Sequence, residues 1–136
     1  FPTFISTEGV LCSSPSSGRV AVFEGFFDFL SLLVMESSPG MDVCVLNSGS
    51  MLGVSKAYLS AHGKIYGLLD NDAAGDIYMD RMRRMLPDSE CVDFRGRYSE
   101  YNDLNDTLPG RKGVRKPVDG QGPKASDQQT FNNNQP

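Results

Sequence analysis

Two aspartates separated by one residue, Asp70 and Asp72, follow an apolar run from Ile65 to Leu69. The run is typical of a buried strand, so both acids are expected in the loop at its carboxyl end, where open α/β sheets bind their ligands. Carboxylates this close repel one another unless a base or a cation neutralises them, and two of them can share one divalent ion. An isolated Asp-x-Asp also occurs in turns and at helix N-caps, so a second acidic position is needed to indicate a metal site.

A second apolar strand ends in an acid in the same way. Residues 19–23, RVAVF, are followed directly by Glu24, a glycine and then FFDFLSLLVME, which predicts a helix that is apolar nearly all round. Asp28 comes one helical turn after Glu24. Because the carboxyl ends of neighbouring parallel strands meet at one edge of a sheet, Glu24 is expected near Asp70 and Asp72.

Three further acids, Glu100, Asp103 and Asp106, lie just beyond a fourth predicted strand at residues 90–94. Asp103 and Asp106 would share one side of a helical turn. If the strands are neighbours, the acids that meet at one edge are Glu24, Asp70, Asp72, Asp103 and Asp106. Oxygen ligands without His or Cys favour Mg²⁺ or Mn²⁺ over zinc, and Mg²⁺ commonly bridges a few carboxylates to substrate phosphates. This edge therefore predicts metal-dependent phosphoryl transfer.

The elements that must position these acids alternate between strand and helix. Strands are predicted at 19–23, 42–47, 64–69 and 90–94, and helices at 26–36, 51–62 and 73–86. This alternation predicts a Rossmann-like α/β domain over residues 19–108, with a mainly parallel sheet of about four strands and helices on both faces. Residues 1–18 are expected to form a small N-terminal β element or the remnant of a preceding domain. Residues 109–136, rich in Gly, Lys, Gln, Asn and Pro, are expected to form a disordered tail or linker.

Composition places the chain among ordinary globular proteins. The net charge of −4 provides no global positive field that would advertise nucleic-acid binding, although a local or metal-bridged contact with phosphates stays open. Three cysteines without C-x-x-C spacing indicate reduced thiols, and no apolar stretch is long enough for a membrane span or a signal peptide. We therefore expect a cytoplasmic protein without a membrane partner. The lack of an initiating Met suggests a fragment or a processed chain.

Other phosphate-handling folds fit the sequence less well. Dehalogenase-type phosphatases and receiver domains carry their acidic pair after the first strand, whereas Asp70 and Asp72 follow the third. Neither G-x-G-x-x-G nor G-x-x-x-x-G-K-[ST] occurs, which argues against a mononucleotide-binding Rossmann domain and a P-loop domain.

Three motifs together carry a family resemblance. They are E-G-x-x-D-x-L from Glu24 to Leu30, D-x-D-x-A-G from Asp70 to Gly75, and D-x-N-D-x-L from Asp103 to Leu108. In this order they resemble the Toprim domain shared by bacterial DnaG-type primases, topoisomerases and OLD-family nucleases, and most resemble primase-like proteins of mobile elements and phages. The resemblance covers residues 19–108, and three ordered motifs are far more specific than any one alone.

The resemblance implies roles for individual residues. Glu24, Asp70 and Asp72 would bind the catalytic Mg²⁺ or Mn²⁺, and Glu24 is alternatively a general base or acid. Asp28 would support the metal or its waters, and Asp103 and Asp106 are further candidate metal ligands. Where relatives often carry Lys before the last motif, this sequence has Asn102, which puts a basic phosphate contact there in doubt. Candidate nucleic-acid contacts are Lys56, Arg95 and Arg97.

The implied function is phosphoryl or nucleotidyl transfer on nucleic acid, as in primer synthesis during DNA replication or mobilisation. Its partners would be DNA or RNA, nucleotides, the other domains of a longer parent protein and a helicase. Two alternatives stay open: a nicking nuclease of the OLD or topoisomerase type, and a Toprim module that binds nucleic acid or a partner without catalysis.

Several side chains near these motifs have two interpretations each. His62 is expected to cap a helix or lie at the surface, since no Cys or acid is near it in sequence. Tyr98 and Tyr101 are expected to pack, with base stacking as the alternative. Ser48 and Ser50 would either contact phosphate or simply form a turn.

Overall fold

The computed structural model describes residues 4–7, 9–36 and 40–108, so the predicted tail at 109–136 lies outside the described residues. The strands are β1 (Phe4–Thr7), β2 (Val10–Ser13), β3 (Arg19–Phe23), β4 (Asp42–Val45), β5 (Lys64–Leu68) and β6 (Glu90–Asp93). The α-helices are α1 (Phe26–Glu36), α2 (Lys56–Leu59) and α3 (Ala73–Met85). Three short 3₁₀ helices are η1 (Gly49–Gly53), η2 (Arg95–Tyr98) and η3 (Asn105–Thr107).

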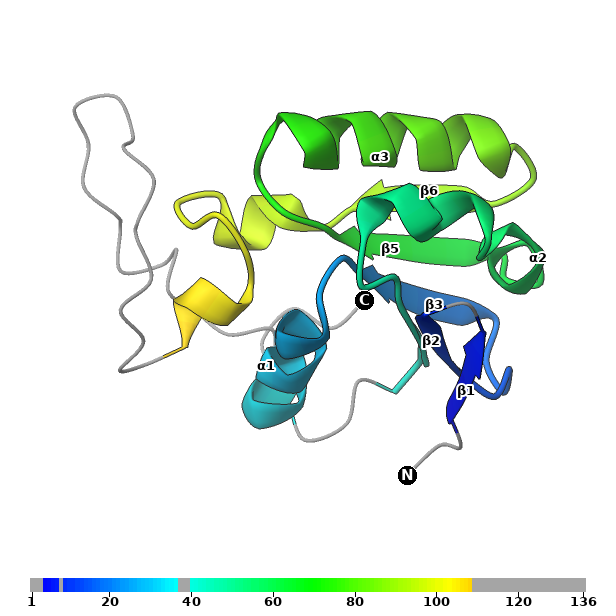
Figure 1. Cartoon of the computed structure of the whole chain (residues 1–136), viewed down its shortest axis with the longest axis horizontal. Helices are drawn as coiled ribbons and strands as arrows, with labels where there is room; N and C mark the ends of the chain where they lie inside the picture. Colours follow the sequence, from blue (N-terminus) through cyan, green and yellow to red (C-terminus); the bar gives the residue numbers. More distant parts are fainter. Residues whose placement is uncertain (1–3, 8, 37–39, 109–136) are drawn as a thin grey trace.

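One six-stranded sheet, in the order β1-β2-β4-β3-β5-β6, organises the domain (Figure 1). The four strands from β3 to β6 are parallel to one another, which confirms the α/β prediction with a mainly parallel sheet. The sheet is larger than the four strands expected, because the antiparallel pair β1 and β2 joins it through β4. The chain places β4 on one side of β3 and β5 on the other, so the carboxyl end of β3 lies at a change of direction where such sheets bind ligands.

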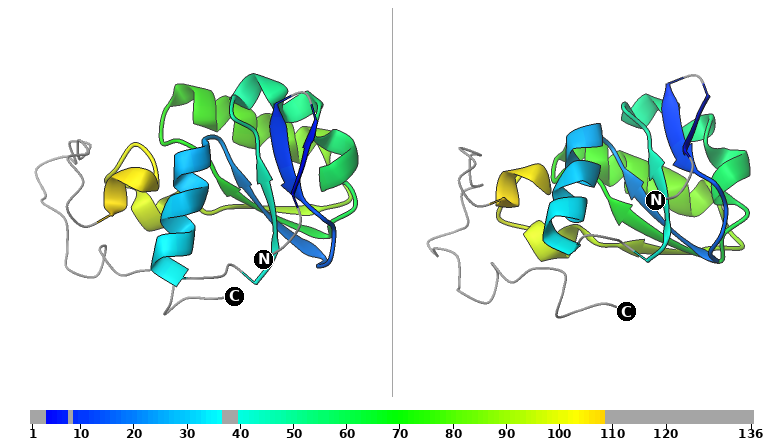
Figure 2. Two further views of the ribbon diagram at one scale, coloured as in Figure 1. Left: turned by 60° about the horizontal axis from the view of Figure 1, so that its bottom comes forward. Right: turned by 90° about the horizontal axis from the view of Figure 1, so that it is seen from below.

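Helices cover both faces of the sheet, as expected. One core contains Phe29 and Leu32 of α1, together with Tyr98 and Leu104, against one face of the strands. The other contains Leu52, Leu59, Met79 and Met82 against the opposite face. Figure 2, turned about the horizontal axis, shows α1 on one side of the strands and α3 on the other. The two layers hold the strands from both sides and leave their carboxyl-terminal edge available for a site.

Two predicted helices differ in detail from the structure. Helix α1 is apolar nearly all round, but only one side is buried: Phe27 and Val34 are 70% and 72% exposed. The helix expected at 51–62 is divided into η1 and α2. Its interruption has a local cause, because the Ser55 hydroxyl donates to the Leu52 carbonyl and so competes with continuous helical hydrogen bonding.

Within the described residues, no helix is both long and apolar enough to cross a membrane.

His62 is buried, which contradicts the expected surface position. Only 1% of the residue is exposed. Its Nε2 lies 2.7 Å from Asp42 Oδ2, and its Nδ1 lies 3.0 Å from the Tyr58 carbonyl oxygen. Asp42 begins β4, 20 positions away in sequence, so only the folded chain supplies the acid that makes burial of this imidazole favourable. The contact with Tyr58 still places the ring at the end of α2, as the capping interpretation expected.

Candidate metal centre

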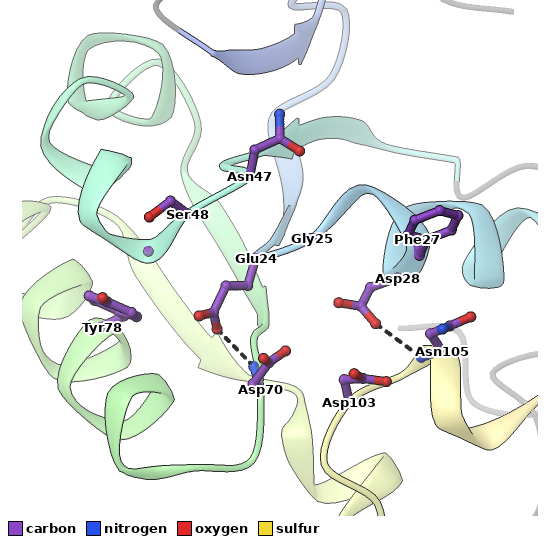
Figure 3. Close-up of a pocket in the computed structure, with 11 residues that line it drawn as sticks. Glu24, Gly25, Phe27, Asp28, Asn47, Ser48, Asp70, Tyr78, Asp103 and Asn105 are labelled. Carbon is purple, nitrogen blue, oxygen red and sulfur yellow. Dashed lines mark hydrogen bonds between the residues drawn. The ribbon is translucent and has the colours of Figure 1, made fainter. Parts of the chain in front are cut away.

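A cavity of about 430 Å³ opens at the carboxyl-terminal edge of the parallel strands (Figure 3). Residues just after β3, β4 and β5 all line it. Its acids are Glu24, Asp28, Asp70 and Asp103. We call this the acidic cavity. The sheet brings these carboxylates together although they come from segments far apart in sequence.

Glu24 and Asp70 are joined directly across neighbouring strands. Phe23 pairs with Leu68 in the register of β3 and β5, so Glu24 and Asp70 follow one and two residues later at the same edge of the sheet. The Asp70 amide donates to Glu24 Oε2 at 3.2 Å. The turn after Asp70 is tight: a Cβ on Gly75 would collide with the Asp70 carbonyl oxygen. Only glycine therefore allows α3 to begin so close to Asp70.

Asp28 and Asp103 occupy the other side of the acidic cavity (Figure 3). Asp28 lies in the first turn of α1 and is 5% exposed. Its Oδ1 accepts a hydrogen bond of 3.0 Å from the Asn105 amide, while the Asn105 side chain accepts one of 2.9 Å from the Ser31 hydroxyl. These two bonds attach the 103–105 segment to α1 and thereby hold Asp103 beside Asp28.

Burial and neighbouring negative charges raise the pKa values of Glu24, Asp28 and Asp70. Burial first, and then the charges of Glu24, Asp28 and Asp103, raise the pKa of Asp70 to about 7. Burial likewise raises the pKa of Asp28 to about 7, against an opposing hydrogen bond from Asn105. Burial raises the pKa of Glu24 as well, although the Asp70 amide opposes this. In the described part of the chain, none of the four carboxylates pairs with lysine or arginine.

A family model described as Toprim-like matches residues 21–108, more than half of the chain. The chain belongs to the Toprim-like family. Among curated proteins, no match to it was found. Membership of the family supports a metal-binding domain with a role on nucleic acid, and it does not distinguish primases from other members.

Two other acids of the Toprim motifs lie outside the acidic cavity. Asp72 caps α3, where its Oδ1 accepts a 2.7 Å hydrogen bond from the Gly75 amide, and it lines a neighbouring recess. The Asp106 amide donates to Asp103 Oδ1, which orients that carboxylate, but Asp106 is absent from the lining. Glu100 is 6% exposed, and its Oε2 has no hydrogen-bond partner among the described residues. Metal binding by Asp72 and Asp106 stays a prediction.

The predicted basic contacts are separated in the Toprim fold. Arg95 pairs with Asp76 and Asp93 at 2.8 Å each, and its Nη1 donates to the Asp70 carbonyl oxygen, so it braces the turn. The Arg97 guanidinium lies 5.3 Å from the centre of the Phe94 ring. Lys56 begins α2, a helix whose Tyr58 contacts Val43 near the amino end of β4. Lys56 is therefore not brought to the acidic cavity.

Several residues that line the acidic cavity or brace its walls are not among those predicted from the sequence. Asn47 lies two residues after β4 and Glu24 one residue after β3, so a polar residue at a strand end is the signal that could have found it. It adopts a positive φ of 62°, which asparagine tolerates better than most residues. Phe27 and Tyr78 also line the cavity. Asn71 donates through its side chain to the carbonyls of Tyr98 and Tyr101, and such long-range contacts leave no sequence signal.

The aromatic and serine predictions have mixed outcomes. Tyr98 is 2% exposed and donates to the Leu69 carbonyl at 2.6 Å, which is packing as expected. Ser48 lines the acidic cavity, and its hydroxyl shares a 2.8 Å hydrogen bond with Ser50, which is not in the lining. Phosphate contact by either serine stays a prediction.

The donor set of the acidic cavity fits a hard cation. The carboxylates supply only oxygen, and within the described residues none of them forms a salt bridge with lysine or arginine. Among the described residues, no three Asp, Glu, His or Cys side chains are grouped closely enough to enclose an ion by themselves. Mg²⁺ retains several waters and commonly uses one or two carboxylates with substrate phosphates, so Glu24 and Asp70 suffice to begin such a site.

Proposed function

We propose that this Toprim domain catalyses Mg²⁺- or Mn²⁺-dependent nucleotidyl transfer on nucleic acid, as in DnaG-type primase-like proteins. The observation that carries the proposal is the convergence of Glu24, Asp28, Asp70 and Asp103 on one cavity without a described basic partner. A divalent ion bound there would neutralise phosphate charge and lower the pKa of an attacking hydroxyl. Glu24 and Asp70 would hold it, and Asp28 and Asp103 would orient its waters.

The protein's own groups also prepare the site for a phosphate substrate. Glu24 Oε2 is fixed by the Asp70 amide, which leaves Oε1 to bind the cation or to accept a proton from the attacking hydroxyl. Ser48 places a hydroxyl on the opposite wall, where it would donate to a phosphate oxygen. The cavity volume of about 430 Å³ falls within the range typical of small-ligand sites.

Metal binding is tested by calorimetric titration of the chain with Mn²⁺ and Mg²⁺. We expect saturable binding that is lost in Asp70→Asn, because this change removes a carboxylate from the cavity and keeps its shape. Asp88→Asn is the matched control: it removes the same charge from an exposed turn and should bind as the native chain does. Equal binding by the native and Asp70→Asn chains would exclude the acidic cavity as the metal site.

Activity is tested by primer synthesis on single-stranded DNA with nucleoside triphosphates and by nicking of supercoiled plasmid, with Asp70→Asn as the blank. Metal-dependent primer synthesis by the chain, or by a longer protein that contains it, is the expected result. Plasmid nicking without primer synthesis would instead favour the nuclease alternative. Metal and nucleic-acid binding without either reaction would favour the non-catalytic module.

A further inference from the structure

Cys12 and Cys44 lie directly opposite one another on the antiparallel strands β2 and β4. Their Sγ atoms are 3.6 Å apart. Opposite residues of antiparallel strands have Cα atoms about 4.5 to 5.5 Å apart, which is within the range of about 4.4 to 6.8 Å that disulfides span. Rotation of the side chains, with little movement of the strands, would therefore bring the sulfur atoms to bonding distance.

The two thiols differ in exposure and in acidity. Cys12 is partly exposed, whereas Cys44 is fully buried. A hydrogen bond with Cys44 lowers the pKa of Cys12 despite the opposing effect of burial. The same hydrogen bond, and then burial, raise the pKa of Cys44. Cys12 is thus the thiol that a soluble oxidant can reach and that ionises more readily, and Cys44 lies buried next to it.

We propose that Cys12 and Cys44 form a reversible oxidation site that a peroxide converts into a cross-strand disulfide. The Cys12 thiolate attacks one oxygen of hydrogen peroxide, which gives Cys12 sulfenic acid and releases hydroxide. The Cys44 sulfur then attacks the Cys12 sulfur, the S–S bond forms, and the sulfenic oxygen leaves as water with the Cys44 proton. Two thiols are oxidised, one peroxide is reduced to two waters, and an external dithiol reverses the reaction.

The disulfide would act on the N-terminal hairpin. It would attach β2 covalently to β4, where the described pairing consists of Leu11 with Val45 and Cys12 with Cys44. Three residues after Cys44, Asn47 lines the acidic cavity and donates to the Gly9 carbonyl of the same hairpin. Oxidation would therefore fix the hairpin against the strand that carries one wall of the cavity. The proposal does not depend on the function of that cavity.

The third cysteine is an internal control. Cys91 lies on β6, separated from β2 in the sheet by β4, β3 and β5. Its Sγ is 3.9 Å from the Met82 carbonyl oxygen, and burial raises its pKa. It should stay reduced when the pair reacts.

The test treats the fully reduced chain with stoichiometric hydrogen peroxide, followed by intact mass measurement, thiol titration in denaturant and peptide mapping. We expect a mass loss of two hydrogens, a fall from the three thiols of the sequence to one, and a Cys12–Cys44 cross-linked peptide that dithiothreitol removes. Retention of all three thiols, a disulfide that includes Cys91, or disulfide-linked dimers would overturn the proposal.

A variant separates the roles of the two thiols. In Cys44→Ser, the sulfenic acid on Cys12 has no thiol to resolve it and should be trapped by dimedone, whereas Cys12→Ser should give little adduct at Cys44. Circular dichroism verifies that both variants fold. If one of them does not fold, the peptide mapping of the native chain still tests the proposal. Equal trapping at both positions in folded variants would contradict the assignment of Cys12 as the reacting thiol.

Discussion

The acidic cavity is unstable electrostatically when no cation is bound. Four carboxylates line it, and burial, followed by the charges of neighbouring acids, raises the pKa values of Asp28 and Asp70 to about 7. Folding alone does not favour such an arrangement, because buried like charges lower stability. A cluster that lowers the stability of the fold and gathers oxygen ligands for a hard cation is typical of a functional site.

Metal affinity should depend on pH as these carboxyls dictate. Above pH about 7 Asp28 and Asp70 are ionised and available, whereas below it protons compete with the cation. We expect affinity for Mn²⁺ to fall by about tenfold per pH unit for each carboxyl that must release its proton. Calorimetry between about pH 8 and about pH 5.5 measures the Mn²⁺ affinity at each pH. In Asp28→Asn we expect the affinity to depend less strongly on pH, because one of the two carboxyls is absent. Constant affinity over that range would show that these carboxyls are not at the metal.

Gly75 should tolerate no side chain. A methyl group there meets the Asp70 carbonyl oxygen, so Gly75→Ala must displace either Asp70 or the first turn of α3. We expect a loss of about 2 kcal/mol in the free energy of unfolding, together with weaker metal binding. Urea denaturation measures the first and calorimetry the second. Gly96→Ala is the control, since a Cβ there meets nothing within 4 Å, and a similar loss in both variants would refute the steric explanation.

Among the elements, the segment after β6 completes the site. Residues 95–108 run across the end of the sheet and include Asp103 and Asn105. The turn after β5 holds this segment through Asn71. The main-chain N–H of Asn71 donates to the Asn102 carbonyl, and the Asn71 side chain donates to the carbonyls of Tyr98 and Tyr101. The middle residue of Asp-Asn-Asp is therefore a structural connection between two walls of the acidic cavity.

Removing the Asn71 side chain should loosen that wall. Asn71→Ala deletes bonds of 2.8 and 2.9 Å to the carbonyls of Tyr98 and Tyr101, which we expect to cost about 1 to 3 kcal/mol. Amide hydrogen exchange over residues 98–106 should accelerate more than exchange in α3. Asn102→Ala is the control, since Asn102 contacts Asn71 through its main-chain carbonyl. Uniform acceleration across both segments would indicate global destabilisation instead.

Across the whole molecule, the two edges of the parallel sheet have different roles. The carboxyl-terminal edge carries the acidic cavity and Asn47, whose φ is positive. The amino-terminal edge is closed by the pair of Asp42 and His62. Burial raises the pKa of Asp42, but hydrogen bonds from His62, Ser16 and Ser17 outweigh it and hold that pKa below its usual value.

This division predicts that stability and metal binding separate. His62→Ala leaves Asp42 buried without its imidazole partner, and we expect a loss of about 3 kcal/mol in the free energy of unfolding. Asp42→Asn keeps an acceptor for Ser16 and Ser17 and should lose less. Calorimetry below the unfolding temperature should show unchanged Mn²⁺ affinity in both folded variants. A marked fall in affinity would mean that the two edges are coupled.

The sequence by itself determined the order of the elements, the mainly parallel sheet and the acids placed directly after β3 and β5. These features depend on local patterns: apolar runs form buried strands, and the residue after a parallel strand lies at the ligand-binding edge. The three motifs also carried the Toprim resemblance, which the family match supports.

Only the tertiary structure decided which acids share the cavity. Asp28 and Asp103 line it because Asn105, 77 positions after Asp28, bonds to that carboxylate, whereas Asp72 turns to cap α3. It also added β1 and β2 to the sheet, buried His62 against Asp42 and placed Cys12 opposite Cys44. Side-chain direction and strand partnership depend on residues distant in sequence, and a local pattern contains no information about them.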